Sequence, residues 1–83
     1  MKIRTEIKGP FGEWLYKKMI NHGVMVYELA EDLHTSAKTI YNHLRNKFDP
    51  TFSHVVMYCW YFNRYFDEKD DPIDIWGELV KGG

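Results

Sequence analysis

Apolar residues recur every three or four positions through the first half of the chain, and this period predicts amphipathic helices. The first run begins just after Pro10, which suits the first turn of a helix, and stops before Gly23, which suits a left-handed helix cap. A second run covers Val26–Leu33. A third follows Ser36, a good N-cap, and extends to about Arg45. The residues expected to face the core from these helices are Phe11, Trp14, Leu15, Met19, Leu29, Ala30, Leu33, Ala37, Ile40 and Leu44.

The second half of the chain predicts one long helix and one short one. The segment Asn46–Pro50 is typical of a loop, and a helix begins near Thr51. Its apolar residues fall on two sides of the helical wheel, so we expect packing partners on both sides. Asp67–Asp71 is a charged linker, and Pro72 starts a last helical turn or two. The first stripe of the long helix is Phe52, Val55, Val56, Cys59, Phe62 and Phe66, the second is Met57, Tyr58, Tyr61 and Tyr65, and the last helix presents Ile73, Trp76, Leu79 and Val80.

Residues 24–45 have the spacing of two short helices that cross with a very brief turn between them. Such a crossing needs a small side chain where the helices touch, and Ala30 supplies it. Ser36 caps the second helix and leaves its amide-rich start pointing outward, where a DNA-reading helix meets phosphates and base edges. The pattern therefore predicts a helix-turn-helix unit over Val24–Arg45.

At these residues the chain resembles the lambda-repressor-like (Cro/repressor, XRE) helix-turn-helix family. The matching stretch is VMVYELAEDLHTSAKTIYNHLRN, from Val24 to Asn46, and the resemblance extends over about Phe11–Phe66. It implies an all-α, lambda-repressor-like fold of four helices plus a short C-terminal helix. The implied divisions are an N-terminal arm (1–10), a helix-turn-helix domain (11–66) and an acidic linker with a C-terminal helix (67–83), which is a candidate dimerisation element. The family commonly has glycine at the first turn position, where this chain has His34.

The resemblance also implies roles for the outward residues of the third helix and their neighbours. Lys38 suits the acceptors of guanine, and Asn42 suits adenine or a phosphate. Tyr41 suits a phosphate or a thymine methyl group, and Ala37 leaves room for a base edge. The residues expected to read bases are therefore Ala37, Lys38, Tyr41 and Asn42, and those expected to hold the DNA backbone are Tyr27, Ser36, Thr39, Arg45, Asn46 and Lys47.

The net charge of the chain is only −1, but the charges are unevenly distributed. Residues 1–22 hold five Lys and Arg against two Glu, and residues 34–47 hold three such cations without an acid. Residues 66–81 hold six acids against two lysines. A molecule with a basic front and an acidic tail presents its positive side to a polyanion despite a near-neutral total.

The remaining chemistry-bearing residues indicate neither catalysis nor metal binding. Cys59 is the single cysteine and falls on the core stripe of the long helix, where a buried thiol is inert. His54 lies five residues away on another helical face, and no His or Cys pair has tight ligand spacing. We therefore expect no enzyme activity and no cofactor. The N-terminus lacks the apolar core of a signal peptide, and no apolar stretch approaches a membrane span, so we expect a cytoplasmic protein without a membrane partner.

The aromatic stripe of the long helix leaves two alternatives open. Met57, Tyr58, Tyr61 and Tyr65, together with Trp76, form either ordinary core or the interface of a homodimer with paired reading heads. The resemblance implies a small, sequence-specific regulator or repressor, of the type found in phages and mobile elements, whose partners are double-stranded DNA and, under the second alternative, another copy of the chain. The alternative is a protein-interaction module that uses the helix-turn-helix core to bind another regulatory protein.

Overall fold

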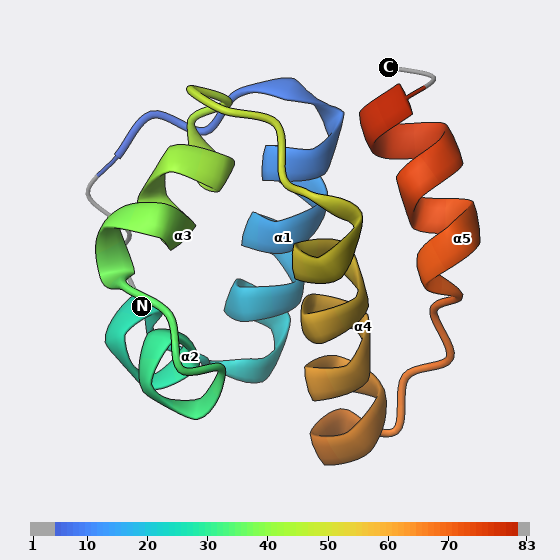
Figure 1. Ribbon diagram of the computed structural model, residues 1–83. Coiled ribbons are helices and arrows are strands. Elements are labelled where there is room, and N and C mark those ends of the chain that lie inside the picture. The colour runs from blue at the N-terminus through green and yellow to red at the C-terminus, as the bar shows by residue number, and fades with distance from the viewer. Residues whose placement is uncertain (1–4, 82–83) are drawn as a thin grey trace. The chain divides into compact units, whose positions relative to one another are not determined.

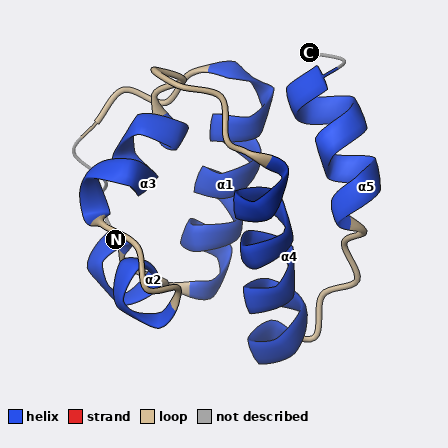
Figure 2. Ribbon diagram, in the orientation of Figure 1, coloured by secondary structure: helices blue, strands red, loops and turns tan. Residues whose placement is uncertain are grey.

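The computed structural model describes residues 5–81, and within that range the chain consists of helices and connecting segments without a strand (Figure 1, Figure 2). The all-α prediction is confirmed for these residues. The helices are α1 (Gly9–His22), α2 (Val26–Asp32), α3 (Ala37–Leu44), α4 (Phe52–Phe66) and α5 (Pro72–Ile75), the last continuing into a π-helical segment, Trp76–Lys81. The chain divides into two compact units, residues 1–48 and 49–83, and this boundary falls inside the expected 11–66 domain. The first four residues of the expected arm lie outside the described range.

The first unit packs α1, α2 and α3 around an apolar core. Leu29, Ile40 and Leu44, which the helical period places in that core, have no exposed surface (0%). Ala30 is 5% exposed and lies on α2, which contacts α3 as the predicted crossing requires. Two of the expected core residues, Trp14 and Ala37, are only half-buried. The buried apolar side chains of this unit are Phe11, Leu15, Met19, Val24, Val26, Leu29, Ala30, Leu33, Ile40 and Leu44.

A close approach between α1 and α3 fixes the geometry of this unit. A Cβ atom on Gly12 would clash with the carbonyl oxygen of Leu44, and it would lie 3.1 Å from the carbonyl carbon. The same oxygen accepts a hydrogen bond from the backbone N–H of Lys8 at 2.9 Å. The last four carbonyls of a helix have no partner within the helix, so this bond satisfies one of the acceptors that α3 leaves open. Together the two contacts hold α1, and the segment before it, against the C-terminal end of α3.

All three helices of the first unit end in the same left-handed turn. Shortly after each helix one residue has a positive φ: Gly23 (65°), His34 (55°) and Asn46 (58°). The N–H of that residue bonds to the carbonyl three residues earlier, and the next N–H bonds to the carbonyl five residues before it. The predicted cap at Gly23 is confirmed. The α2–α3 turn closes on His34 without glycine, which is tolerated because histidine enters this conformation more readily than most side chains.

In the second unit, a side-chain clamp joins the end of α4 to the linker before α5. Thr51 and Asp71 cap the two helices by accepting backbone N–H groups of the first turn. Between them, the Asn63 amide donates to the Asp70 carbonyl at 2.8 Å and accepts from the Asp70 N–H at 3.0 Å. This pair of bonds imitates a backbone ladder, and it holds the acidic linker against α4. We call it the Asn63 clamp.

The aromatic residues of α4 divide differently from the prediction. Tyr58 and Tyr61 are 1% and 6% exposed, so the core alternative applies to these two residues. Burial raises the pKa of the Tyr58 phenol above its ordinary value. Phe52 and Val56, which the wheel assigns to the first stripe with the core, are exposed instead, because a wheel finds apolar sides without ranking their burial. The remaining members of the proposed interface are half-buried or exposed: Met57, Tyr65 and Trp76.

Three further expectations concern the described residues alone. The predicted burial of the Cys59 thiol is confirmed. Within residues 5–81, no group of three or more His, Cys, Asp or Glu side chains is arranged to hold a metal ion. In the same range, none of the helices combines the length and the apolar character needed to cross a bilayer.

The contact at Gly12 generates a prediction about stability. We expect Gly12→Ala to lower the free energy of unfolding by about 1–3 kcal/mol, because the new methyl group meets rigid backbone at Leu44. This sign is opposite to the usual gain of ~0.5–1 kcal/mol when Ala replaces Gly in a helix. Chemical denaturation followed by circular dichroism measures it. The control is Gly77→Ala, whose Cβ would meet nothing within 4 Å; equal losses in the two variants would contradict the contact.

The strained turn at His34 generates a second prediction. We expect His34→Gly to raise the free energy of unfolding by about 1 kcal/mol, because glycine adopts the left-handed backbone without crowding its Cβ. His34→Val should lower it, since a β-branched side chain suits this backbone least. The side chain is exposed, so neither change removes a buried contact. Thermal melts of the two variants measure the difference, and a higher Tm for the valine variant than for the glycine variant would contradict the prediction.

Candidate nucleic-acid interface

The start of α3 is held by a polar cap at the expected residue. The Ser36 Oγ accepts a hydrogen bond from the Thr39 backbone N–H at 3.1 Å, which confirms the predicted N-cap. The two hydroxyl oxygens lie 2.9 Å apart and share a second hydrogen bond. Two hydroxyls carry two hydrogens, and their mutual bond uses one of them. One hydroxyl hydrogen therefore remains available to an outside acceptor at the helix start.

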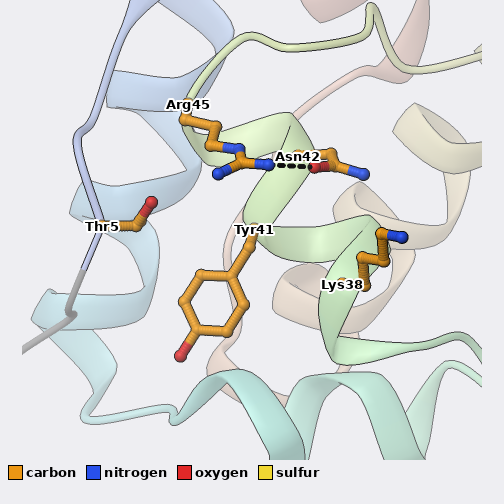
Figure 3. Close-up of a pocket in the computed structure, with 5 residues that line it drawn as sticks. All are labelled: Thr5, Lys38, Tyr41, Asn42 and Arg45. Atoms are coloured by element: carbon orange, nitrogen blue, oxygen red, sulfur yellow. Dashed lines mark hydrogen bonds between the residues drawn. The ribbon is translucent and has the colours of Figure 1, made fainter.

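One face of α3 gathers four polar residues at spacings of three and four. Lys38, Tyr41, Asn42 and Arg45 follow one another along this face, and Thr5 of the N-terminal arm lies beside them (Figure 3). The five residues line an open hollow of about 410 Å³. We call these five residues the α3 face. Figure 3 shows the arm on one side and the α3 side chains on the other.

A hydrogen bond within this face orients the Asn42 amide. The Arg45 guanidinium donates from Nη2 to the Asn42 Oδ1 at 3.1 Å. A guanidinium only donates, so the contact fixes which end of the amide turns toward it. Figure 3 shows the Asn42 oxygen directed at Arg45 and the amide nitrogen directed away. Among the described residues, no partner accepts from that nitrogen.

The expected exposure of Asn42 requires correction. Its position on the wheel is opposite Ile40 and Leu44, as predicted, but its exposed fraction is only 7%. The Arg45 guanidinium donates to its amide oxygen, and Asn42 lines the same hollow as Thr5. Asn42 is thus a recessed residue of the α3 face.

The other residues with predicted DNA roles are mostly accessible. Lys38 is exposed, and Ala37 and Tyr41 are half-buried. Tyr27, on the first turn of α2, is 60% exposed. Thr39 is half-buried, and Ser36 is exposed. Three consecutive exposed residues follow α3, and two of them are cations: Arg45, Asn46 and Lys47.

The cations of this region are not neutralised by nearby carboxylates. Among residues 5–81, no carboxylate lies within ion-pair distance of Lys38, Arg45 or Lys47. The Lys47 ammonium instead lies 5.8 Å from the centre of the Phe48 ring. Their charge is therefore available to an anion, and the distribution predicted from the sequence holds locally around α3.

The sequence did not indicate that the arm would border α3. Thr5 lines the hollow because the Lys8 N–H bonds to the Leu44 carbonyl, which brings the arm to the C-terminal end of α3. The predicted helix start at Gly9-Pro10 indicated that the residues before it are extended. No sequence pattern indicated that they run toward α3. The Arg45–Asn42 bond was also missed, although the two residues are three apart and such pairs meet on a helix.

Searches of protein-family models, curated proteins and solved structures find no match for this chain.

Proposed function

We propose that this chain binds double-stranded DNA in a sequence-specific manner, with the α3 face entering the major groove. The α3 face carries the proposal, because it presents two cations and three neutral polar residues without a neighbouring carboxylate among the described residues. The helix that carries it is fixed at both ends. Ser36 caps its start, and the contacts of Gly12 and Lys8 hold its last carbonyl. A rigid polar helix of this kind is what base reading requires.

In this proposal the residues divide between base edges and phosphates. Lys38, Tyr41 and the Asn42 amide nitrogen point to base edges, with Ala37 leaving room beside them. The backbone is held by the residues that flank α3, whose charge and hydroxyl groups suit phosphate oxygens. These are Tyr27, Ser36, Thr39, Arg45, Asn46 and Lys47. We extend the proposal to a cytoplasmic regulator that represses by occupying its operator, of the kind that phages and mobile elements carry.

A second surface supports pairing of two copies. Phe52, Val56 and Trp60 are spaced by four along α4, and 41%, 37% and 49% of their surfaces are exposed. We call this row the α4 ridge. Tyr65 lies against Trp60, with ring centres 6.1 Å apart, and is itself 56% exposed. Neighbouring exposed apolar side chains on one helix are a candidate interaction site.

The spacing of the α4 ridge suits a second copy of the same chain. Its two aromatic residues stand on either side of Val56, so two antiparallel ridges place Phe52 of each copy against Trp60 of the other. Arg64 continues the row beyond Trp60, over whose ring it lies at 5.8 Å. In that arrangement Arg64 approaches the segment before α4 of the second copy, where the exposed Asp49 lies. The order of the aromatic residues and the charges along this row therefore both suit an antiparallel second copy.

The exposed area indicates a modest affinity between the copies. At ~150–250 Å² per aromatic side chain, the exposed fractions of Phe52, Trp60 and Tyr65 leave about 300 Å² per copy. Val56, which is 37% exposed, adds to it. The ridges of two copies then bury less than the ~1,000–1,200 Å² typical of stable specific interfaces, so we expect weak pairing that depends on concentration.

The DNA-binding proposal predicts the response to salt and to single lysines. We expect log K for a duplex selected from a random pool to fall linearly with log salt concentration. Lys47→Ala should reduce the slope by about one and weaken all duplexes alike. Lys38→Ala should weaken the selected duplex by about 1–3 kcal/mol and reduce its preference over random duplexes. Fluorescence anisotropy over a salt series measures both quantities.

The matched control is Lys69→Ala, which removes an exposed lysine from the acidic linker and should leave slope and preference unchanged. Binding that stays at the non-specific level for every duplex, with no effect of Lys38→Ala, would count against the proposal. In that case the alternative of a module that binds another regulatory protein gains weight, and the α4 ridge is its candidate surface.

The α4 ridge predicts the effect of a charge on self-association. We expect Trp60→Glu to convert dimers to monomers at micromolar concentration, because each new carboxylate would be buried without a partner against Phe52 of the other copy. Analytical ultracentrifugation of the full chain over a concentration series measures the mass. Tyr27→Glu serves as the control, since it places the same charge at an exposed aromatic position of the first unit and should leave the mass unchanged. A wild-type chain that stays monomeric throughout would rule out pairing through the ridge.

A further inference from the structure

The α3 face carries more hydrogen-bond donors than acceptors. Lys38 and Arg45 only donate, and the single amide on the face, Asn42, has its oxygen engaged by Arg45. The remaining members, Thr5 and Tyr41, contribute one hydroxyl each. Apart from those two hydroxyls and the second lone pair of the Asn42 oxygen, which lies beside the guanidinium, the face offers only donors.

This excess of donors affects how Asn42 can contact a base. An asparagine that reads adenine uses both ends of its amide, since the oxygen accepts from the N6 amino group and the nitrogen donates to N7. Here the oxygen faces a guanidinium at 3.1 Å. An amino group that approached the same oxygen would meet this positive charge, so the adenine pairing is disfavoured.

We infer that the Arg45–Asn42 bond makes α3 a donor-rich reading head that selects guanine, and rejects adenine, at the base pair contacted by Asn42. The inference rests on the proposed DNA binding and names its base specificity. Lys38 and Asn42 are four residues apart, so their nitrogen atoms share one row of the helix. The major-groove edge of guanine presents two adjacent acceptors, O6 and N7, which match two donors. Adenine presents only one acceptor there and adds a donor.

Arg45 therefore acts as a positioning residue for Asn42 in addition to any phosphate contact. It holds the amide in one orientation and blocks the acceptor, and this second effect is independent of its general attraction to DNA. Arg45→Met removes the blocking donor while keeping the apolar length of the side chain. Lys47→Met is the matched control, because it also removes one exposed cation after α3 but has no bond to Asn42.

The experiment begins with selection of bound duplexes from a random pool by the full chain. The position that depends on Asn42 is the one whose base preference disappears in Asn42→Ala. At that position we expect guanine, and replacing its pair by A·T should weaken wild-type binding roughly fivefold to a hundredfold. Substituting 7-deazaguanine, which lacks the N7 acceptor, should also weaken binding. Arg45→Met should bring the affinities for G and A at that position to within about threefold of each other, whereas Lys47→Met should weaken both and keep their ratio.

The outcomes separate this inference from the function on which it rests. A pool without any enriched sequence overturns both. An enriched site with adenine at the Asn42-dependent position, or a G-to-A ratio that is the same in Arg45→Met and Lys47→Met, overturns the inference and leaves DNA binding intact. If Asn42→Ala does not fold, as judged by circular dichroism, the comparison of the two methionine variants at every guanine of the site gives the same decision.

Discussion

The carbonyl oxygen of Leu44 is the point on which the first unit depends. It belongs to the last turn of α3, where carbonyls lack partners inside the helix. The Lys8 N–H satisfies it, and Gly12 allows α1 to approach it more closely than any side chain would permit. One oxygen therefore determines both how α1 lies on α3 and where the arm begins. The hollow lined by Thr5 and the α3 residues follows from that arrangement.

The polar side of α3 shows how a local contact changes the chemistry that a helix offers. Residue types alone give Asn42 a donor and an acceptor of equal availability. The neighbouring Arg45 commits the acceptor, and the low exposure of Asn42 limits the directions from which anything reaches it. The chemistry of the proposed reading head therefore depends on which hydrogen-bonding groups remain for DNA. Knowing which residues face outward is not enough.

The sequence predicted the helices and the core of the first unit well, because both follow from local rules. The spacing of Leu29, Ile40 and Leu44 and the caps at Gly23 and Ser36 depend on residues close in the chain. Contacts between distant residues were not predictable in the same way. Nothing in the hydrophobic pattern distinguishes Gly12, whose missing Cβ matters only because Leu44 lies against it.

The candidate site and α4 show the same difference between local features, which the sequence predicts, and contacts between distant residues, which it does not. The cations around α3 were identified from residue type, but the hydrogen bond of Asn42 comes from Arg45, and the position of Thr5 at the hollow depends on the path of the arm. On α4, the wheel found two apolar sides without ranking the burial of their residues, and Tyr58 of the second stripe is buried while Phe52 of the first is exposed. Burial depends on which elements cover a helix, and that information is not contained in the period of the helix itself.

The Asn63 clamp has a consequence for the topology of any dimer. Its two hydrogen bonds to Asp70 close the acidic linker into a short loop, so that α5 begins at a fixed place beside its own α4. A tethered helix meets its own binding surface at a very high effective concentration, far above that of a helix from another chain. Exchange of α5 between two copies would first break this loop in both. Two copies that associate are therefore expected to do so as complete units side by side, with each chain retaining its own C-terminal helix.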